Sequence, residues 1–394
     1  MVWPILISLA LTQPGLAQTK YGPGVTDKEI KIGNTMPYSG PASSYGTIGK
    51  AETAYFAMIN DQGGVNGRKI KFISLDDGYS PPKTVEQTRR LVEQDEVLFD
   101  FSPLGTPTNS AIQKYLNAKK VPQLFVATGA TKWGDFKRFP WTMGWQPSYQ
   151  AEAKIYAKYL LKNKPDAKIG VLYQNDDFGK DYLTGLKEGL GDKAAKMIVS
   201  EVSYEVTDPT VDSQIVTLQS SGANTFVNVT TPKFAAQAIR KAYDIGWHPL
   251  QLLTNVSVSV GAVLKPAGLD KSTGIITAGY LKDPDDPQFK NDKAMQEWRS
   301  FMAKYYPEGS LHDILNVYGY TVAQSLAQVL KQCGDDLTRA TVMKEAAHLD
   351  MAPGTLQPGV TIRTGADDYF PIQQMRLEKF DGKNWVPFGG AIGS

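Results

Sequence analysis

Residues 30–77 read IKIGNTMPYSGPASSYGTIGKAETAYFAMINDQGGVNGRKIKFISLDD and predict one complete strand–loop–helix–turn–strand unit. Ile30 and Ile32 alternate with a lysine and a glycine, which is the pattern of a half-buried strand. Apolar residues at helical spacing follow in residues 48–59, a Gly-Gly pair ends that helix, and a second strand comes after a tight turn. In a βαβ unit the loop after the first strand lies at the carboxyl edge of a parallel sheet, where open α/β sheets bind ligands. The small residues SGPASSYG at 39–46 occupy that loop.

The alternation of strands and helices continues along the chain. Up to residue 126 it predicts four strands with crossover helices, which indicates a parallel sheet. An aromatic-rich stretch at 133–145 interrupts the pattern, which then restarts and runs to residue 254. This order predicts two doubly wound α/β lobes with a crossing near residues 144–149. Beyond Gly274 we expect the chain to return to the first lobe through a helix at 318–331.

Length and composition restrict the class of protein. A chain of 394 residues with 42% hydrophobic and 21% charged residues has the make-up of a soluble protein of two domains. The formal net charge of +2 gives no reason to expect nucleic acid or an anionic membrane surface as a partner, and no segment predicts membrane insertion. The single cysteine, Cys333, can form neither an internal disulfide nor a thiolate metal cage.

The first 18 residues, MVWPILISLALTQPGLAQ, differ from the rest because they carry no charge. Their apolar core at 5–11 is too short to span a bilayer, and Gly15 and Ala17 are small residues at the positions that a signal peptidase reads. We therefore predict a signal peptide at residues 1–17, cleaved after Ala17. The usual basic n-region is missing, so a hydrophobic terminus on a cytosolic protein remains the alternative.

Enzyme signatures fail on inspection. A Gly-Lys pair at 49–50 is followed by alanine, where a P-loop needs Ser or Thr. The three histidines are scattered, so they support neither a zinc site nor a Ser-His-Asp arrangement. The carboxylate pairs at 76–77 and 176–177 end strands, where they either do acid–base chemistry or cap helices and turns. We expect no catalytic centre, no metal and no cofactor.

Two loops have the chemistry of a binding site. Residues 101–107, FSPLGTP, connect a strand to a helix, and a helix start offers N–H donors and partial positive charge to a carboxylate. Residues 126–131, VATGAT, end the next strand with a second set of small and hydroxyl residues. Neighbouring strands let the two loops converge on one anion. The alternative, that Thr106 and Thr131 only cap their helices, is equally compatible with this chemistry.

The segments SGPASSYG and NDQGGVNGRKIKFISLDD also carry a resemblance. They resemble the amino-terminal unit of periplasmic solute-binding proteins of branched-chain amino acid ABC transporters, in which P-x-S-G-P and N-x-x-G-G-[IV]-N-G occupy these two places. The resemblance implies a type I periplasmic binding protein fold, a periplasmic location, a monomer, and ABC transporter permease subunits as partners. It implies the following domains: a signal peptide at 1–17, lobe I at 28–145 plus 275–354, and lobe II at 146–274 plus 355–394.

Candidate ligand-binding residues follow from the same resemblance. Family members hold the ligand carboxylate with a Ser or Thr in the first loop and an A-x-T segment in the second, and they place aromatic residues against the ligand. The positions of this chain that match are Tyr45, Gly105, Thr106, Gly129, Ala130, Thr131, Phe178, Thr231 and Asn255.

Asn255 is a departure from the family pattern. In that family, amino acid binders place an acidic residue there to pair with the ligand ammonium. This chain has no Asp or Glu anywhere between Asp244 and Asp270. A neutral amide gives about half the interaction of a charge-assisted hydrogen bond, and burying an ammonium without a counter-charge is expensive. Aromatic side chains that can stack on a ligand crowd the inter-lobe region: Trp133, Trp141, Trp145, Tyr149 and Phe178.

These observations predict a non-enzymatic, exported receptor that closes around a small carboxylate, preferably an aromatic acid without an α-ammonium, and delivers it to an ABC importer. The alternative within the same class is a receptor for branched-chain or other hydrophobic amino acids. A ligand-sensing regulatory domain on the same fold is the alternative from another class, and it would need a DNA-binding or signalling domain as well.

Overall fold

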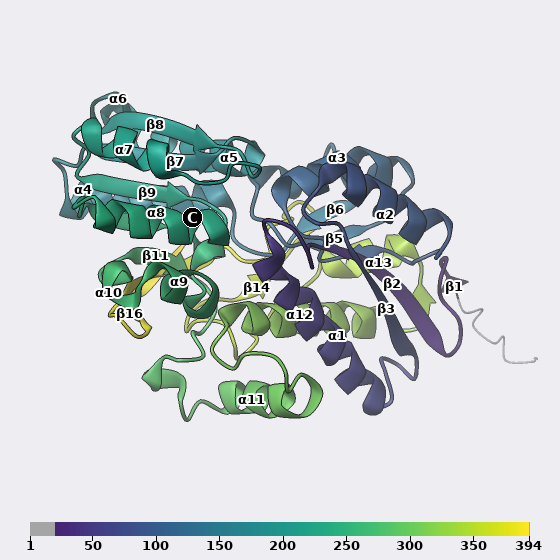
Figure 1. Ribbon diagram of the computed structural model, residues 1–394. Coiled ribbons are helices and arrows are strands. Elements are labelled where there is room, and N and C mark those ends of the chain that lie inside the picture. The colour runs from purple at the N-terminus through teal and green to yellow at the C-terminus, as the bar shows by residue number, and fades with distance from the viewer. Residues whose placement is uncertain (1–19, 394) are drawn as a thin grey trace, which may run out of the picture.

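Two separate sheets form the framework of the computed structural model, which describes residues 20–393 (Figure 1). The first sheet has five parallel strands in the order β3-β2-β4-β5-β6. Its strands are β2 (Glu29–Met36), β3 (Lys69–Asp76), β4 (Asp100–Phe101), β5 (Gln123–Val126) and β6 (Thr142–Gly144). The strands and the helix predicted for residues 30–77 therefore form, and β2 and β3 are paired from Glu29↔Lys69 to Met36↔Asp76.

Helices from two distant parts of the chain cover this first sheet and complete the first lobe. α12 packs along α1, and its N-terminus is capped by Asp313, whose carboxylate accepts a hydrogen bond from the Leu315 N–H. The short strands β1 (Lys20–Tyr21) and β12 (Asp336–Leu337) pair with each other, as do β13 (Asp350–Met351) and β14 (Ile362–Arg363). The helices are α1 (Gly46–Asp61), α2 (Pro81–Glu93), α3 (Thr106–Ala118), α11 (Lys293–Tyr305), α12 (Ile314–Cys333) and α13 (Arg339–Ala346).

The second lobe is built on a seven-stranded sheet in the order β16-β15-β11-β10-β9-β7-β8. The strands are β7 (Ile169–Gln174), β8 (Ile198–Tyr204), β9 (Thr225–Val229), β10 (Leu250–Leu253), β11 (Ile276–Gly279), β15 (Gln374–Phe380) and β16 (Trp385–Gly393), of which β15 and β16 run antiparallel. The helices are α4 (Tyr149–Asn163), α5 (Asp177–Leu190), α6 (Ala194–Met197), α7 (Asp212–Ser220), α8 (Pro232–Asp244), α9 (Lys265–Ala267) and α10 (Leu269–Ser272).

The predicted α/β class with two doubly wound lobes is confirmed, and one predicted crossing is wrong. The return to the first lobe was placed at residue 275, but β11 first joins the second sheet, where Ile276 pairs with Leu252. All four residues of β11 are buried, and β15 covers its other edge. A short buried strand carries no periodicity that says which sheet it enters, so the sequence pattern could not place it. The predicted signal peptide at 1–17 lies outside the described residues.

Other described features bear on the class of protein. Among residues 20–393 no helix is both long and apolar enough to cross a bilayer. No group of three or more metal-ligating side chains in this part of the chain is placed to hold a metal ion. Cys333 is buried and free, and burial raises the pKa of its thiol to about 12.

Candidate functional site

A narrow cavity lies between the two lobes, with a water-accessible volume of about 60 Å³. Most of its walls come from loops at the carboxyl ends of strands in both sheets, which is the edge where open α/β sheets bind ligands, and residues of α12 and β15 complete them. The lobes touch across it, because the Tyr45 hydroxyl donates to the carbonyl oxygen of Val256 at 3.0 Å. Six aromatic side chains line the cavity: Tyr45, Tyr79, Tyr149, Phe178, Tyr280 and Tyr318.

One end of the cavity has the features of an anion site. Helix α3 starts at Thr106, directly after Gly105, which has a φ of 101°. A side chain at position 105 would meet the ring of Tyr79 at 2.5 Å, so glycine lets the loop approach the cavity. No side chain caps this helix start, and the hydroxyl of Thr108 donates instead to the carbonyl of Leu104. The first turn therefore keeps N–H groups and partial positive charge for a ligand.

A chain of hydroxyl groups supports this helix start. Thr106 Oγ1 lies 2.5 Å from Thr128 Oγ1, which lies 3.2 Å from the hydroxyl of Tyr149. Burial is the main cause that raises the pKa of Tyr149, so its hydroxyl keeps its proton. With an anion next to Thr106, each hydroxyl can donate to the next in the order Tyr149, Thr128, Thr106, and such chains strengthen cooperatively.

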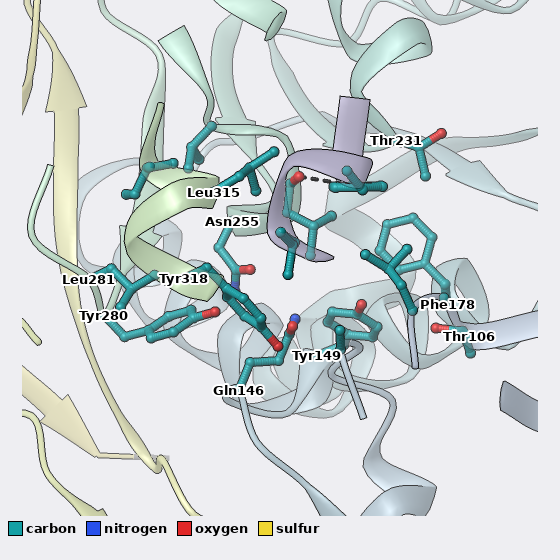
Figure 2. A pocket seen from close by; sticks show the side chains of 18 of the residues that line it. Thr106, Gln146, Tyr149, Phe178, Thr231, Asn255, Tyr280, Leu281, Leu315 and Tyr318 are labelled. Atoms are coloured by element: carbon teal, nitrogen blue, oxygen red, sulfur yellow. Dashed lines mark hydrogen bonds between the residues drawn. The ribbon is translucent and has the colours of Figure 1, made fainter. Parts of the chain in front are cut away.

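The structure brings most, but not all, of the predicted residues to the cavity. Those that line it are Tyr45, Gly105, Thr106, Phe178, Thr231 and Asn255. Figure 2 shows Thr106, Phe178 and Thr231 on one side and Asn255 further across the cavity. Phe178 meets the ring of Tyr149 edge-on, with a centroid separation of 5.0 Å, and the N–H of Thr231 donates to the hydroxyl of Tyr204 at 3.0 Å.

Gly129, Ala130 and Thr131 do not line the cavity, so their predicted place in the carboxylate site is corrected. Thr131 faces helix α5 instead, where its N–H and its hydroxyl both donate to Asp181 Oδ2 at 2.8 Å. The carbonyl of Gly129 accepts the N–H of Tyr149 at 2.7 Å, which turns this loop away behind the tyrosine ring. The second loop therefore approaches the site through Thr128, and Thr131 joins the two lobes.

Asn255 is hydrogen-bonded to a buried carboxyl group that the sequence analysis did not identify. Its backbone N–H donates to Glu152 Oε1 at 2.9 Å, and its side-chain Nδ2 donates to Glu152 Oε2. Glu152 also accepts hydrogen bonds from the hydroxyls of Tyr156 at 2.5 Å and Tyr182 at 2.6 Å. Burial raises the pKa of Glu152 to about 7, although these hydrogen bonds act in the opposite direction. Glu152 precedes Asn255 by 103 positions, so no local pattern signals their contact.

Three more polar groups that sequence reasoning missed line the cavity. Gln146 Nε2 and the hydroxyl of Tyr318 are buried and have no hydrogen-bond partner among the described residues. Glu378 comes from β15, accepts a hydrogen bond from Gln357 at 2.6 Å, and has a pKa that burial raises well above its ordinary value. In Figure 2, Gln146 and Tyr318 lie across the cavity from Thr106, so polar groups occur at both ends of the cavity, with Tyr149 between them.

Comparison with known proteins decides the family. A family model described as periplasmic binding protein matches residues 29–384. The chain belongs to this family. It is 24% identical over 339 residues to the Leu/Ile/Val-binding protein homolog 1 of Brucella abortus, and the aligned region covers 83% of this chain and 85% of that protein.

Solved structures share the fold of this periplasmic binding protein at low sequence identity. A branched-chain amino acid ABC transporter protein from Thermus thermophilus with bound valine has a TM-score of 0.82 at 16% identity, covering 94% of this chain and 98% of its own. A solute-binding protein of an ABC transporter from Rhodopseudomonas palustris, in complex with 3,4-dihydroxybenzoic acid, has a TM-score of 0.77 at 18% identity, with 93% and 97% covered. These structures hold different ligands, so the ligand of this chain must be inferred from its own cavity.

Proposed function

We propose that this protein is the extracytoplasmic receptor of an ABC importer and closes around a small carboxylate, with an aromatic acid as the preferred class. The observation that carries the proposal is the uncapped first turn of α3 at the cavity, supported by the hydroxyl chain of Thr106, Thr128 and Tyr149. Hydrogen bonds to a charged group each contribute about 1.5–3 kcal/mol, so two or three of them supply a useful share of a micromolar affinity.

The rest of the cavity favours an aromatic body for this ligand. Six aromatic rings line it, and aromatic rings pair favourably with a flat ring edge-on or offset. Contacts between the lobes then hold the closed form. The Tyr45 hydroxyl reaches Val256, and Asp181 of the second lobe accepts two hydrogen bonds from Thr131 of the first. Hinge closure around a ligand is the mechanism that this arrangement supports.

A receptor for hydrophobic amino acids is the second candidate, and the two buried acids near the cavity favour it. Glu152 is hydrogen-bonded to Asn255, and Glu378 lines the cavity. Carboxyl groups are therefore present near the ligand site, although the sequence around Asn255 contains none. However, an ammonium requires one of these groups to ionise, and burial raises both pKa values. The oxygens of Glu152 also already accept hydrogen bonds from the protein, which leaves Asn255 as the group that faces the ligand.

Native mass spectrometry of the purified protein, followed by a thermal-shift and calorimetry screen, tests this proposal. The screen compares benzoate and its derivatives with leucine, isoleucine and valine. We expect at least one aromatic carboxylate to bind more tightly than all three amino acids. Tight binding of leucine with no response to any aromatic acid would refute the aromatic assignment and favour the second candidate.

A further inference from the structure

The side-chain amide of Asn255 turns its oxygen toward the cavity while its Nδ2 donates to Glu152. We infer that Glu152 fixes this orientation and that the ligand carries a hydrogen-bond donor without a positive charge, such as a hydroxyl group, at the end that meets Asn255. This inference rests on the proposed function, because it adds a second polar group to a ligand whose carboxylate binds at α3.

Two of the three N–H donors of Asn255, the backbone N–H and one N–H of Nδ2, are used within the protein. The backbone N–H and Nδ2 each donate to a different oxygen of Glu152. Rotating the amide by half a turn would place its oxygen against a carboxyl oxygen, with no proton between two acceptors unless Glu152 supplied one. Figure 2 shows the amide oxygen of Asn255 turned toward the middle of the cavity, so a ligand meets a hydrogen-bond acceptor there.

Glu152 itself is held in place on both of its oxygens. The Tyr182 hydroxyl donates to Oε2 at 2.6 Å, and the Tyr156 hydroxyl lies 2.5 Å from Oε1 and 2.7 Å from the carbonyl of Leu253. When Glu152 is ionised, Tyr156 donates to it. When Glu152 is protonated on Oε1, it donates to Tyr156, which then donates to Leu253. With the proton on Oε1, Oε2 still accepts from Asn255, so protonation at that oxygen leaves the orientation of the amide unchanged.

The chemistry of the neighbouring groups selects a hydroxyl over an ammonium. A hydroxyl that donates to Asn255 keeps lone pairs that can accept a hydrogen bond from Nε2 of Gln146. Gln146 is 6% exposed, and its Nε2 is buried and has no partner among residues 20–393. An ammonium has no acceptor, so it would leave Gln146 unpaired and add a charge to a buried cavity. The geometry therefore favours a hydroxylated carboxylate with an aromatic or other apolar middle.

Calorimetry with matched ligands tests the inference. The probes are benzoate, 3- and 4-hydroxybenzoate, and the corresponding methoxybenzoates, in which the donor is lost and the oxygen is kept. We expect one hydroxybenzoate to bind at least tenfold more tightly than both benzoate and its own methyl ether. Equal affinities across the three kinds of ligand overturn the inference and leave the proposed function standing. Binding of leucine alone, or of no member of either set, overturns both.

Glu152→Gln separates a positioning role from a merely structural one. A glutamine whose Nε2 faces position 255 can donate to the Asn255 oxygen, so the amide turns and offers Nδ2 to the cavity. We expect the preference for the hydroxyl over the methoxy ligand to fall at least fivefold or to reverse. Asp100→Asn is the matched control, since Asp100 is equally buried and also has a pKa raised to about 7, but it lies outside the cavity and should keep the preference.

A second variant keeps the test decisive if Glu152→Gln does not fold. Asn255→Leu removes the acceptor and preserves most of the volume, so we expect it to lose the hydroxybenzoate preference while binding of benzoate changes much less. Retention of the full preference in Asn255→Leu, or in a folded Glu152→Gln, refutes the role of these two residues.

Discussion

The hydroxyl of Thr106 is the most direct test of the carboxylate site. Thr106→Val removes one donor to the charged group and nearly keeps the shape of the side chain. A hydrogen bond to a charged group contributes about 1.5–3 kcal/mol, which corresponds to a loss of about 10- to 150-fold in affinity for a carboxylate. The loss should be specific to the charge. We therefore expect the affinity ratio of benzoate to benzamide, measured by calorimetry, to fall by about the same factor.

Thr131→Val is the matched control, because it makes the same chemical change in the neighbouring loop but outside the cavity. Its hydroxyl donates to Asp181 across the lobes, so the change should weaken closure by about 1 kcal/mol for every ligand and leave the benzoate-to-benzamide ratio unchanged. Thermal unfolding of both variants checks that Thr128, which loses a partner in Thr106→Val, does not disturb the fold. An unchanged ratio in Thr106→Val, or an equal fall in both variants, would contradict the assignment of the anion site to α3.

Three further predictions follow from other parts of the molecule. Asp181→Asn weakens the hydrogen-bond acceptor for Thr131 and for Gln150. Calorimetry should therefore show that the affinity falls about 3- to 30-fold for all ligands alike. A fall limited to carboxylates would show that Asp181 acts on the ligand directly. Burial, with Asp77 nearby, raises the pKa of Asp100 to about 7 from 3.8, so the folded state favours its protonated form. The corresponding stability is present below about pH 4 and is lost as the pH rises to about 7. In urea unfolding, the wild type should lose about 4 kcal/mol of unfolding free energy relative to Asp100→Asn over that interval. Parallel pH profiles of the two proteins would disprove the assignment. For export, amino-terminal sequencing of protein from the periplasm should begin at or near Gln18, and an intact terminus on protein found only in the cytoplasm would contradict it.

The sequence alone identified the loops of the site because their signals are local. Gly105 and Thr106 stand where a strand ends and a helix begins, and that position sends the loop to the carboxyl edge of a sheet. Tyr45 follows the first strand in the same way, and it lines the cavity. The choice within the second loop was different. Thr128 and Thr131 are both hydroxyl residues of the run VATGAT, and no local rule decides which of them supports the helix start.

Packing between segments determines which of Thr128 and Thr131 supports the helix start, and it determines the other contacts of the cavity that the sequence does not indicate. The bond from the Tyr149 N–H to the Gly129 carbonyl directs Thr128 toward Thr106 and Thr131 toward α5. Glu152 meets Asn255 because α4 packs beside the end of β10, and Glu378 reaches the cavity because β15 pairs with β11. Strand and helix periodicity arises from neighbours along the chain, so the alternation of residues 30–77 determined the α/β class. The hydrogen bonds of Asn255 with Glu152 and of Tyr45 with Val256 join residues more than a hundred positions apart, and only the folded chain places these groups together.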